Sequence, residues 1–437
     1  MMLLEWFRPG LNIKRWIIMG ACGLSLFILG ISKLLFRGLI FDAYSLLFFY
    51  ISIIGVILMY ASLKLAFKNA MMIITGEPVD KEKFSNKFFE QKMLVRGPKI
   101  VAIGGGTGLS TMLRGLKEYT TNITAIVTVA DDGGGSGKLR RTLGMLPPGD
   151  IRNCLVALAH TEPLMEELMQ YRFKDGELKG QSFGNLFIAA MNGISSNFEE
   201  AIKKMSDVLA VKGKVYPVTL TDVTLCARLK NGEVVKGESI IPEVCYEKRQ
   251  QIDYIYLEPQ DVKPLDEAIA AIEEADCIVI GPGSLYTSIM PNLVIKEVAE
   301  AVKKSKAIKV YISNIMTQLG ETEGYKLSDH INAIEKHCGG QFINFVIANN
   351  GKIPEEYFKK YKSDGQDVVE NDVENIRETI DIIFKNLVHI NENGLLRHNT
   401  HVLAKTIMEL IIKYVFPNDR RRVLDYYYLS ERLKHKR

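Results

Sequence analysis

The sequence predicts an α/β protein with a parallel β-sheet, preceded by two helices that cross a membrane. Short apolar runs rich in β-branched residues alternate with helical patterns along most of the chain, which is typical of a parallel sheet covered on both faces. Glycine clusters follow the ends of several of these runs, and two long uncharged segments occupy the first 70 residues. With 437 residues, the chain is long enough for one large α/β domain and an appendage.

The composition excludes several classes of protein. With 47% hydrophobic and 24% charged residues, the chain is neither disordered nor fibrous. Its formal net charge of +4 is small and spread along the sequence, so we expect no nucleic-acid partner. The six cysteines are far apart and form no Cys-x-x-Cys pair, which predicts reduced thiols in a cytosolic compartment. His398 and His401 have helical spacing but no third ligand nearby, so we expect no catalytic zinc.

The two uncharged segments predict a transmembrane helical hairpin within residues 1–70. They cover about 16–36 and 44–63, and the second is long enough to cross roughly 30 Å of hydrocarbon. Lys and Arg flank the outer ends of the hairpin, which places the bulk of the protein in the cytoplasm. A cleaved signal peptide is the alternative, but no small-residue cleavage pattern separates the segments. Because the segments contain no Asp, Glu or His, we expect an anchor rather than a transport path.

Two polar segments flank the predicted folded domain, which covers residues 98–416. The charged segment 71–97 predicts a linker. The basic C-terminal tail, 417–437, is interpreted as a solvated end, and contact with anionic lipid headgroups is the alternative.

The folded domain begins with one βαβ unit. An apolar strand at 99–104 breaks into glycines, a helical pattern follows at 109–116, and a second apolar strand covers 122–129. The Asn231-Gly232 turn within 215–237 predicts a β-hairpin, which is an insertion or a sheet edge. Further along the chain, the pattern predicts helix 266–275, strand 277–281, helix 294–303, strand 308–312 and strand 342–348. This alternation predicts a doubly wound, Rossmann-like sheet.

The first glycine cluster directly follows the first strand. Ligands of open α/β sheets bind at the carboxyl ends of the strands, where backbone N–H groups and helix N-termini are exposed. The dinucleotide-binding pattern Gly-x-Gly-x-x-Gly fails here because Leu109 occupies the third glycine position. We therefore predict a phosphate-binding loop rather than an NAD site, with a tight turn that binds nothing as the alternative. The candidate binding residues are Gly104, Gly105, Gly106, Thr107 and Gly108.

The second glycine cluster follows the second strand and begins with Asp131 and Asp132. It resembles a Walker loop, but Asp132 replaces the first glycine and Leu139 replaces the Ser or Thr that binds Mg²⁺, which excludes an ATPase. One carboxylate can accept a ribose or uracil-type hydroxyl while the other meets a cation or another loop. We predict that both acids are ligand-binding or catalytic residues, and helix capping is the alternative.

Two shorter motifs place polar side chains at the start of predicted helices. Arg152 and Asn153 are donors suited to a phosphate or to the edge of a base. Asp150 and Asn185 belong to the same motifs but are equally suited to capping a helix. We include all four among the candidate ligand-binding residues.

The last glycine cluster follows the strand at 277–281. Glycines and hydroxyl side chains ahead of a helix are typical of an anion-binding loop. The hydrolase pattern Gly-x-Ser-x-Gly is not satisfied, because Tyr286 stands where its second glycine belongs. The candidate binding residues here are Gly281, Gly283, Ser284, Tyr286, Thr287, Ser288 and Asn292.

Together these motifs resemble the bacterial gluconeogenesis-factor (YvcK-like) family. The resemblance covers about residues 98–416, and the motifs stand in the same order. They are Gly-Gly-Gly-Thr-Gly-Leu at 104–109, Ala-Asp-Asp-Gly-Gly at 130–134, Pro-Pro-Gly-Asp-Ile-Arg at 147–152, Ser-Phe-Gly-Asn-Leu at 182–186 and Gly-Pro-Gly-Ser-Leu-Tyr-Thr-Ser at 281–288.

The resemblance implies a Rossmann-like domain related to the 2-phospho-L-lactate transferases (CofD-like). It also implies a regulator, needed for gluconeogenic growth and normal cell shape, that binds UDP-sugars such as UDP-N-acetylglucosamine and acts with envelope-synthesis proteins. The N-terminal hairpin is absent from many members, so we expect this regulator to be tethered to the cell membrane with its main domain in the cytoplasm. Gly135 stands where the family pattern has another Ser, which argues against binding through a hydroxyl there.

The sequence leaves catalysis and self-association open. The alternative to a regulator is a Mg²⁺-dependent transferase that moves a phosphorylated group from a nucleotide-activated donor, with Asp131 or Asp132 at the metal. An NAD(P) oxidoreductase is disfavoured by the register of the first glycine loop.

Overall fold

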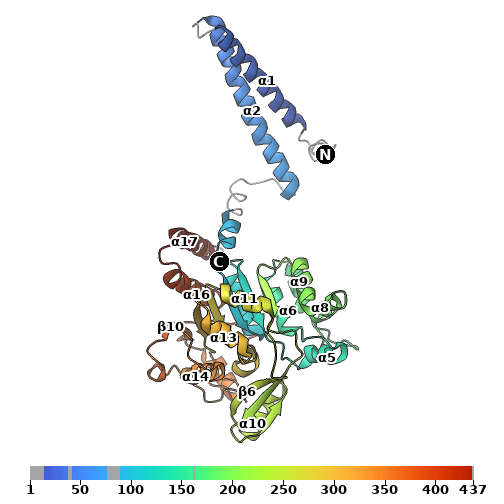
Figure 1. The fold of residues 1–437 in the computed structure, drawn as a ribbon, viewed down its shortest axis with the longest axis vertical. Coiled ribbons are helices and arrows are strands. Elements are labelled where there is room, and N and C mark those ends of the chain that lie inside the picture. Colours follow the sequence, from blue (N-terminus) through green and yellow to red (C-terminus); the bar gives the residue numbers. More distant parts are fainter. Residues whose placement is uncertain (1–13, 38–41, 76–88, 161–162, 436–437) are drawn as a thin grey trace. The chain divides into compact units, whose positions relative to one another are not determined.

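The computed structural model describes residues 14–37, 42–75, 89–160 and 163–435 (Figure 1). The chain divides into two compact units, Met1–Gln91 and Lys92–Arg437.

The first unit contains two long apolar helices, α1 (Lys14–Arg37) and α2 (Ala43–Thr75). Both are long and apolar enough to cross a membrane, over Lys14–Phe36 and Ala43–Asn69, and most of their large apolar side chains are exposed. Small residues let the helices approach closely, since a Cβ at Gly55 would lie 2.6 Å from the carbonyl oxygen of Gly23. The two apolar helices expected from the sequence are confirmed.

The second unit is built on a parallel sheet of seven strands in the order β10-β9-β8-β7-β1-β2-β3. The chain starts at β1 in the middle, runs outward to β3, returns to β7 beside β1, and continues outward in the other direction. The sheet therefore has a switch point between β1 and β7, as the doubly wound prediction requires. The strands are β1 (Ile100–Gly104), β2 (Ile123–Val127), β3 (Lys214–Pro217), β7 (Cys277–Ile280), β8 (Ile308–Ile312), β9 (Phe345–Asn349) and β10 (Asp381–Lys385).

The central strands form the core of this unit. Every residue of β1 and β7 is buried, which explains their continuous apolar sequences, because a parallel strand is covered on both faces. The strand expected at 342–348 begins only at Phe345, where its pairing with β8 and β10 starts.

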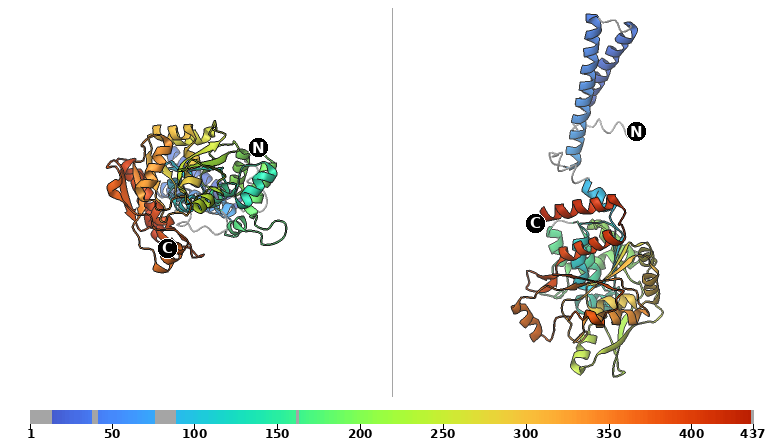
Figure 2. Two further views of the ribbon diagram at one scale, coloured as in Figure 1. Left: turned by 90° about the horizontal axis from the view of Figure 1, so that it is seen from below. Right: turned by 90° about the vertical axis from the view of Figure 1, so that its left-hand side faces the viewer.

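Helices cover both faces of the sheet (Figures 1 and 2). Helix α4 contacts both α6 and α16, and α13 contacts both α11 and α14 in a second group. Right-handed crossovers place these groups on opposite faces, because the chain reverses its direction across the sheet at the switch point. The helices are α4 (Gly106–Leu116), α5 (Gly134–Leu143), α6 (Gly149–Leu158), α7 (Pro163–Gln170), α8 (Phe183–Gly193), α9 (Phe198–Val208), α10 (Ile241–Lys248), α11 (Asp266–Glu274), α12 (Met290–Leu293), α13 (Lys296–Lys304), α14 (Leu327–Cys338), α15 (Glu355–Ser363), α16 (Thr400–Tyr414) and α17 (Arg420–His435).

The predicted β-hairpin insertion is confirmed, but its limits change. The first residues of the predicted segment 215–237 belong to the main sheet, where Val215 of β3 pairs with Ala125 of β2. The Asn231-Gly232 turn connects the hairpin, and a third strand completes a small antiparallel sheet. Its strands are β4 (Thr224–Leu229), β5 (Val234–Lys236) and β6 (Ile252–Glu258).

A second small sheet precedes α16. It consists of β11 (Val388–Ile390) and β12 (Leu396–His398), which pair in antiparallel fashion. Its strands were not among those predicted from the sequence. This hairpin brings the end of the chain back to the carboxyl edge of the main sheet, where it lines the cavity described next.

Candidate functional site

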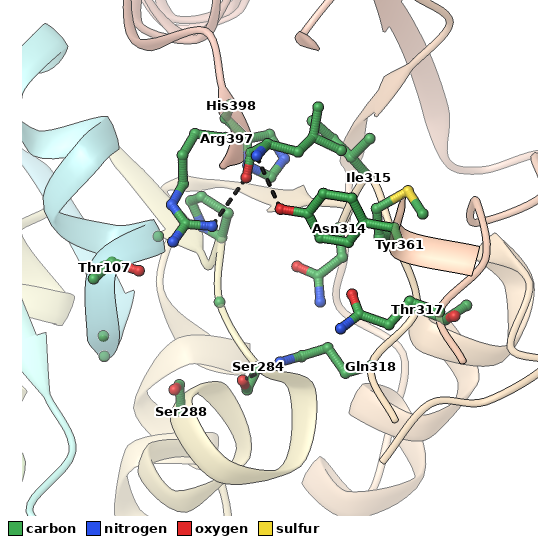
Figure 3. A pocket seen from close by; sticks show the side chains of 18 residues that line it. Thr107, Ser284, Ser288, Asn314, Ile315, Thr317, Gln318, Tyr361, Arg397 and His398 are labelled. Atoms are coloured by element: carbon green, nitrogen blue, oxygen red, sulfur yellow. Dashed lines mark hydrogen bonds between the residues drawn. The ribbon is translucent and has the colours of Figure 1, made fainter. Parts of the chain in front are cut away.

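A cavity of about 290 Å³ lies at the switch point, at the carboxyl ends of the strands (Figure 3). Five parts of the chain line it: the loop after β1, the loop after β7, the segment after β8, the end of α15 with the segment that follows it, and the β11–β12 hairpin. The side chains labelled in Figure 3 are Thr107, Ser284, Ser288, Asn314, Ile315, Thr317, Gln318, Tyr361, Arg397 and His398.

The loop after β1 presents the N-terminus of α4 to this cavity. The cap residue Gly105 supplies no side-chain hydrogen bond to the first turn, so N–H groups after Gly106 can face an anion. Gly106 has a φ of +67°, which favours glycine. At Gly108, a Cβ would lie 2.6 Å from the carbonyl oxygen of Pro282, so the two glycine-rich loops pack backbone against backbone.

Polar groups line the side of the cavity formed after β7 and β8. Gly283, Ser284 and Ser288 come from the first of these segments. Gln318 Nε2 donates a hydrogen bond to Ser284 Oγ at 2.7 Å, while Gln318 Oε1 is buried and has no partner among the described residues. The amide of Asn314 points into the same space (Figure 3). This side therefore offers amide groups suited to the edge of a base.

Two residues predicted from the same motif lie outside the cavity. The chain after β7 forms a π-helical turn, η2 (Leu285–Ile289). Tyr286 Oη lies 2.8 Å from Tyr325 Oη, and Thr287 Oγ1 donates a hydrogen bond to Glu321 at 3.1 Å. Both side chains are buried and bond to the segment that precedes α14.

The remaining predicted residues of these two loops support the strand ends. Asn292 is buried, and its Nδ2 donates a hydrogen bond to the carbonyl oxygen of Gly104 at 3.2 Å. Gly281 has a φ of +80° at the end of β7. These residues hold the switch point together rather than line the cavity.

The β11–β12 hairpin supplies the cation of the cavity. Arg397 is half-buried and is the only charged side chain among the described residues that line the cavity. His398 donates a hydrogen bond from Nε2 to the carbonyl oxygen of Ser313 at 3.0 Å. Burial lowers the pKa of His398 to about 4, so this ring is neutral at pH 7. Sequence reasoning missed Arg397 because a three-residue strand leaves no periodic pattern.

The predicted acids form a second group on the other side of the Gly105–Gly106 turn. The carboxylate of Asp150 accepts the N–H of Gly106, and a Cβ at Gly105 would lie 2.5 Å from its Oδ2. Burial, and then the nearby carboxylate of Asp131, raise the pKa of Asp150 to about 6. The turn therefore separates the cavity from a group of carboxylates.

Asp131 and Asp132 shape the loop between β2 and α5. Asp131 Oδ1 accepts the N–H of Gly133 at 2.9 Å, and burial raises the pKa of Asp131. Asp132 Oδ1 accepts the N–H of Ser239 at 3.0 Å, which connects the loop to the small antiparallel sheet. Glu238, which the sequence analysis did not single out, joins them: burial, with neighbouring carboxylates, raises its pKa to about 8.

This acidic group is not a resident metal cage. No three His, Cys, Asp or Glu side chains in the described part of the chain are placed to hold a metal ion. Mg²⁺ commonly binds through one or two carboxylates together with phosphate oxygens. Asp131 and Asp132 therefore fit a Mg²⁺ ion that arrives with a phosphorylated ligand.

The predicted donors Arg152, Asn153 and Asn185 are brought together but bond to one another. Arg152 is buried and donates to Asn185 Oδ1 and to Asn153 Oδ1, both at 2.8 Å, and also to Ser182 Oγ. Ser182 also caps α8, where it accepts the N–H of Asn185 at 3.2 Å. The network fixes α6 against α8 and so positions Asp150 in the first turn of α6.

The raised pKa of Asp150 predicts a pH-dependent stability. A carboxyl whose pKa is about 6 in the folded state and 3.8 when unfolded holds its proton more tightly in the folded state between these values. Its contribution to the free energy of unfolding therefore falls as pH rises from about 4 to 6. As pH rises across this window, the free energy of unfolding of the unsubstituted protein should fall by on the order of 2 kcal/mol relative to that of Asp150→Asn. Urea unfolding of both proteins at pH 4.5 and 7 measures the difference, and parallel pH profiles would contradict the prediction.

The fold and the site define a Rossmann-like α/β protein with a glycine-lined cavity at the switch point of its sheet. The sequence pattern described as 2-phospho-L-lactate transferase CofD matches residues 100–388, and the chain belongs to this family. Its relatives place it among the gluconeogenesis factors of that family: the Bacillus subtilis gluconeogenesis factor is 47% identical over 72% of this chain and 98% of its own length.

Two further comparisons extend this result to the whole chain and to the fold. A Clostridium acetobutylicum relative is 49% identical over 100% of this chain and 98% of its own length. A crystal structure of a Bacillus halodurans protein is 44% identical, covers 70% of this chain and 98% of that one, and superposes with a TM-score of 0.67. The shorter relatives leave about a quarter of this chain unmatched, so the family fold forms without that part.

Proposed function

We propose that this protein is a membrane-tethered regulator of gluconeogenic growth that binds a UDP-sugar at the switch point. The gluconeogenesis factors among its relatives support the metabolic role. The cavity between the two glycine-rich loops carries the proposal for the ligand, because it combines a helix N-terminus with one cation and with amide groups. Envelope-synthesis proteins are the proposed downstream partners.

The diphosphate of the ligand fits the cleft between the N-terminus of α4 and Arg397. Backbone N–H groups and a guanidinium both bind phosphate oxygens, and the helix dipole adds positive potential there. One end of the ligand then meets the amides of Asn314 and Gln318, which can pair with the edge of uracil or with hydroxyls. The other end extends past the Gly105–Gly106 turn toward the carboxylates, which accept hydroxyl hydrogen bonds.

The two apolar helices support the tether. Their length and their exposed apolar side chains suit a bilayer, and the flanking Lys and Arg residues favour a multi-pass membrane protein with its main domain in the cytoplasm. The full chain is then expected in the membrane fraction of lysed cells, resistant to extraction with high salt, while a chain of residues 76–437 is expected in the soluble fraction. Equal distributions of the two chains would overturn the tether.

Calorimetry tests the ligand. We expect residues 76–437 to bind UDP-N-acetylglucosamine and UDP-glucose with a Kd in the micromolar range. GTP and NAD(P) should bind at least about tenfold more weakly, because the amides of Asn314 and Gln318 suit uracil, and the N-terminus of α4 with Arg397 suits a diphosphate. Each mixture is also assayed for products, with and without Mg²⁺. Tight binding of GTP alone would overturn the proposed ligand.

A transferase is the second candidate, and the family match favours it. In that case Asp131 and Asp132 would hold Mg²⁺ at the phosphates of a nucleotide-activated donor. Mg²⁺-dependent product formation that is lost in Asp132→Asn identifies a transferase, whereas saturable binding without product identifies a regulator.

A further inference from the structure

Helix α17 (Arg420–His435) packs on the domain through one side only. Tyr426 and Leu429 are buried, and the ring of Tyr426 stacks on Tyr119 with 6.1 Å between the ring centroids. Asp425 forms an ion pair with Arg96 at 2.7 Å. Because Arg96 and Tyr119 precede β1 and β2, α17 lies at the amino edge of the parallel sheet, opposite the cavity.

The other side of α17 combines exposed apolar, aromatic and basic side chains. Leu424 is 68% exposed, Tyr427 60% and Tyr428 41%. At 3.6 residues per turn, these three residues share one side of the helix with Arg420 and Arg421, which are also exposed. We call this set the outer face of α17. Its acidic residue, Glu431, forms an ion pair with Lys434 at the far end.

We propose that the outer face of α17 binds the surface of an anionic lipid bilayer. Helices that lie in the membrane interface combine leucine and aromatic rings on one side with Lys or Arg at the rim, where the rings sit at headgroup depth and the cations meet anionic lipid. Leu424, Tyr427 and Tyr428 are exposed together rather than packed in the core, and such an apolar patch is typical of an interaction surface.

The chain itself brings this face to a bilayer, a step that rests on the tether of the proposed function. Residues 76–91 connect the end of α2 to the second unit and can span at most about 60 Å. Arg96, directly after that connection, is paired with α17. A tether this short keeps the helix at high effective concentration near the membrane, which adds to the affinity of the outer face itself.

Binding through α17 would also orient the cavity. The outer face belongs to the amino edge of the sheet, and the cavity opens at the carboxyl edge. A domain that lies on the bilayer through α17 therefore directs its ligand site toward the cytosol, where nucleotide sugars and protein partners reach it.

A fluorescent reporter tests the proposal on residues 76–437, which contain the whole of the second compact unit, Lys92–Arg437. The chain has two tryptophans, Trp6 and Trp16, and both are removed with the hairpin. Tyr427→Trp therefore places a single tryptophan on the outer face. Tyr246→Trp is the matched control, because Tyr246 is 53% exposed on α10, in the small antiparallel sheet region. Each protein is mixed with vesicles of phosphatidylcholine alone or with added phosphatidylglycerol.

We expect a blue shift of tryptophan emission for Tyr427→Trp with the anionic vesicles, and none for Tyr246→Trp. Adding Arg420→Glu and Arg421→Glu should weaken vesicle binding about tenfold or more, since each cation contributes at the surface. The matched pair Lys230→Glu and Lys248→Glu changes the net charge equally, on exposed residues of the β4–β5 turn and of α10, and should leave binding unchanged. Circular dichroism confirms that each variant is folded.

Three results would overturn the proposal: no blue shift at position 427, an equal shift at position 246, or an equal loss in both charge-reversal pairs. These outcomes are distinct from failure of the proposed function. A missing tether appears as full-length protein in the soluble fraction, and a missing ligand appears in calorimetry, whereas the vesicle experiment requires neither the hairpin nor the ligand.

Discussion

Arg397→Ala is expected to weaken the binding of UDP-N-acetylglucosamine by about 10- to 100-fold. Arg397 is the only charged side chain among the described residues that line the cavity, and it is half-buried, so water screens it only in part. Hydrogen bonds from a guanidinium to phosphate are worth roughly 1.5–3 kcal/mol, which corresponds to this range of affinity. Calorimetry on residues 76–437 measures the change directly.

Two further variants show whether a loss of affinity comes from the guanidinium of Arg397 or from a general change in charge or stability. Arg397→Lys keeps the charge but loses the planar pair of donors, so we expect an intermediate affinity. Arg228→Ala removes an exposed arginine that pairs with Asp253 at 2.9 Å in the small antiparallel sheet, and it should bind as the unsubstituted protein does. In Arg397→Ala, the loss of affinity should be confined to phosphorylated ligands. If Arg397→Ala bound the ligand with unchanged affinity, Arg397 would not belong to the proposed binding site.

The central strands could be predicted because their environment is simple. β2 and β8 are largely buried and apolar. β1 and β7 are buried along their whole length, and such strands appear in the sequence as continuous apolar runs that break at glycine. The glycine loops at their ends then place the switch point without knowledge of any long-range contact. By contrast, β11 and β12 have three residues each, too few for a pattern, and so Arg397 could not be foreseen.

The direction of side chains within a motif was the least predictable property of the site. Ser284, Tyr286, Thr287 and Ser288 all follow β7, but the π-helical turn sends only the two serines to the cavity. The other two side chains bond to Tyr325 and to the buried carboxylate of Glu321, more than thirty residues further along the chain. A contact between residues so far apart in the chain cannot be predicted from the local sequence.

The polar side chains at helix starts show the same limit. Arg152 has the chemistry of a phosphate ligand, but in the folded chain its two terminal nitrogens donate to Ser182, Asn153 and Asn185. The sequence indicated that these residues were important without deciding whether they bind a ligand or one another. Their role here is to position Asp150. The carboxylate of Asp150 accepts the N–H of Gly106 and lies on the side of the loop where the other carboxylates are.

Gly108→Ala is expected to lower the free energy of unfolding by about 1–3 kcal/mol, the usual cost of overpacking. The added Cβ would lie 2.6 Å from the carbonyl oxygen and 2.9 Å from the carbonyl carbon of Pro282. These are backbone atoms, so no side chain can move aside to relieve the contact. Gly193→Ala is the matched control, because nothing lies within 4 Å of its Cβ, and the substitution should be neutral or slightly stabilising in α8. Urea unfolding of the three proteins gives the differences.

Gly108→Ala should also affect ligand binding. Gly108 and Pro282 lie where the two glycine-rich loops that line the cavity pack on each other, so any shift that accommodates the Cβ also moves N–H groups of α4. We therefore expect Gly108→Ala to weaken UDP-sugar binding together with stability, whereas Gly193→Ala changes neither. If Gly108→Ala were destabilised but bound UDP-N-acetylglucosamine unchanged, the diphosphate could not lie against the N-terminus of α4, and the site would have to be sought on the carboxylate side of Gly105.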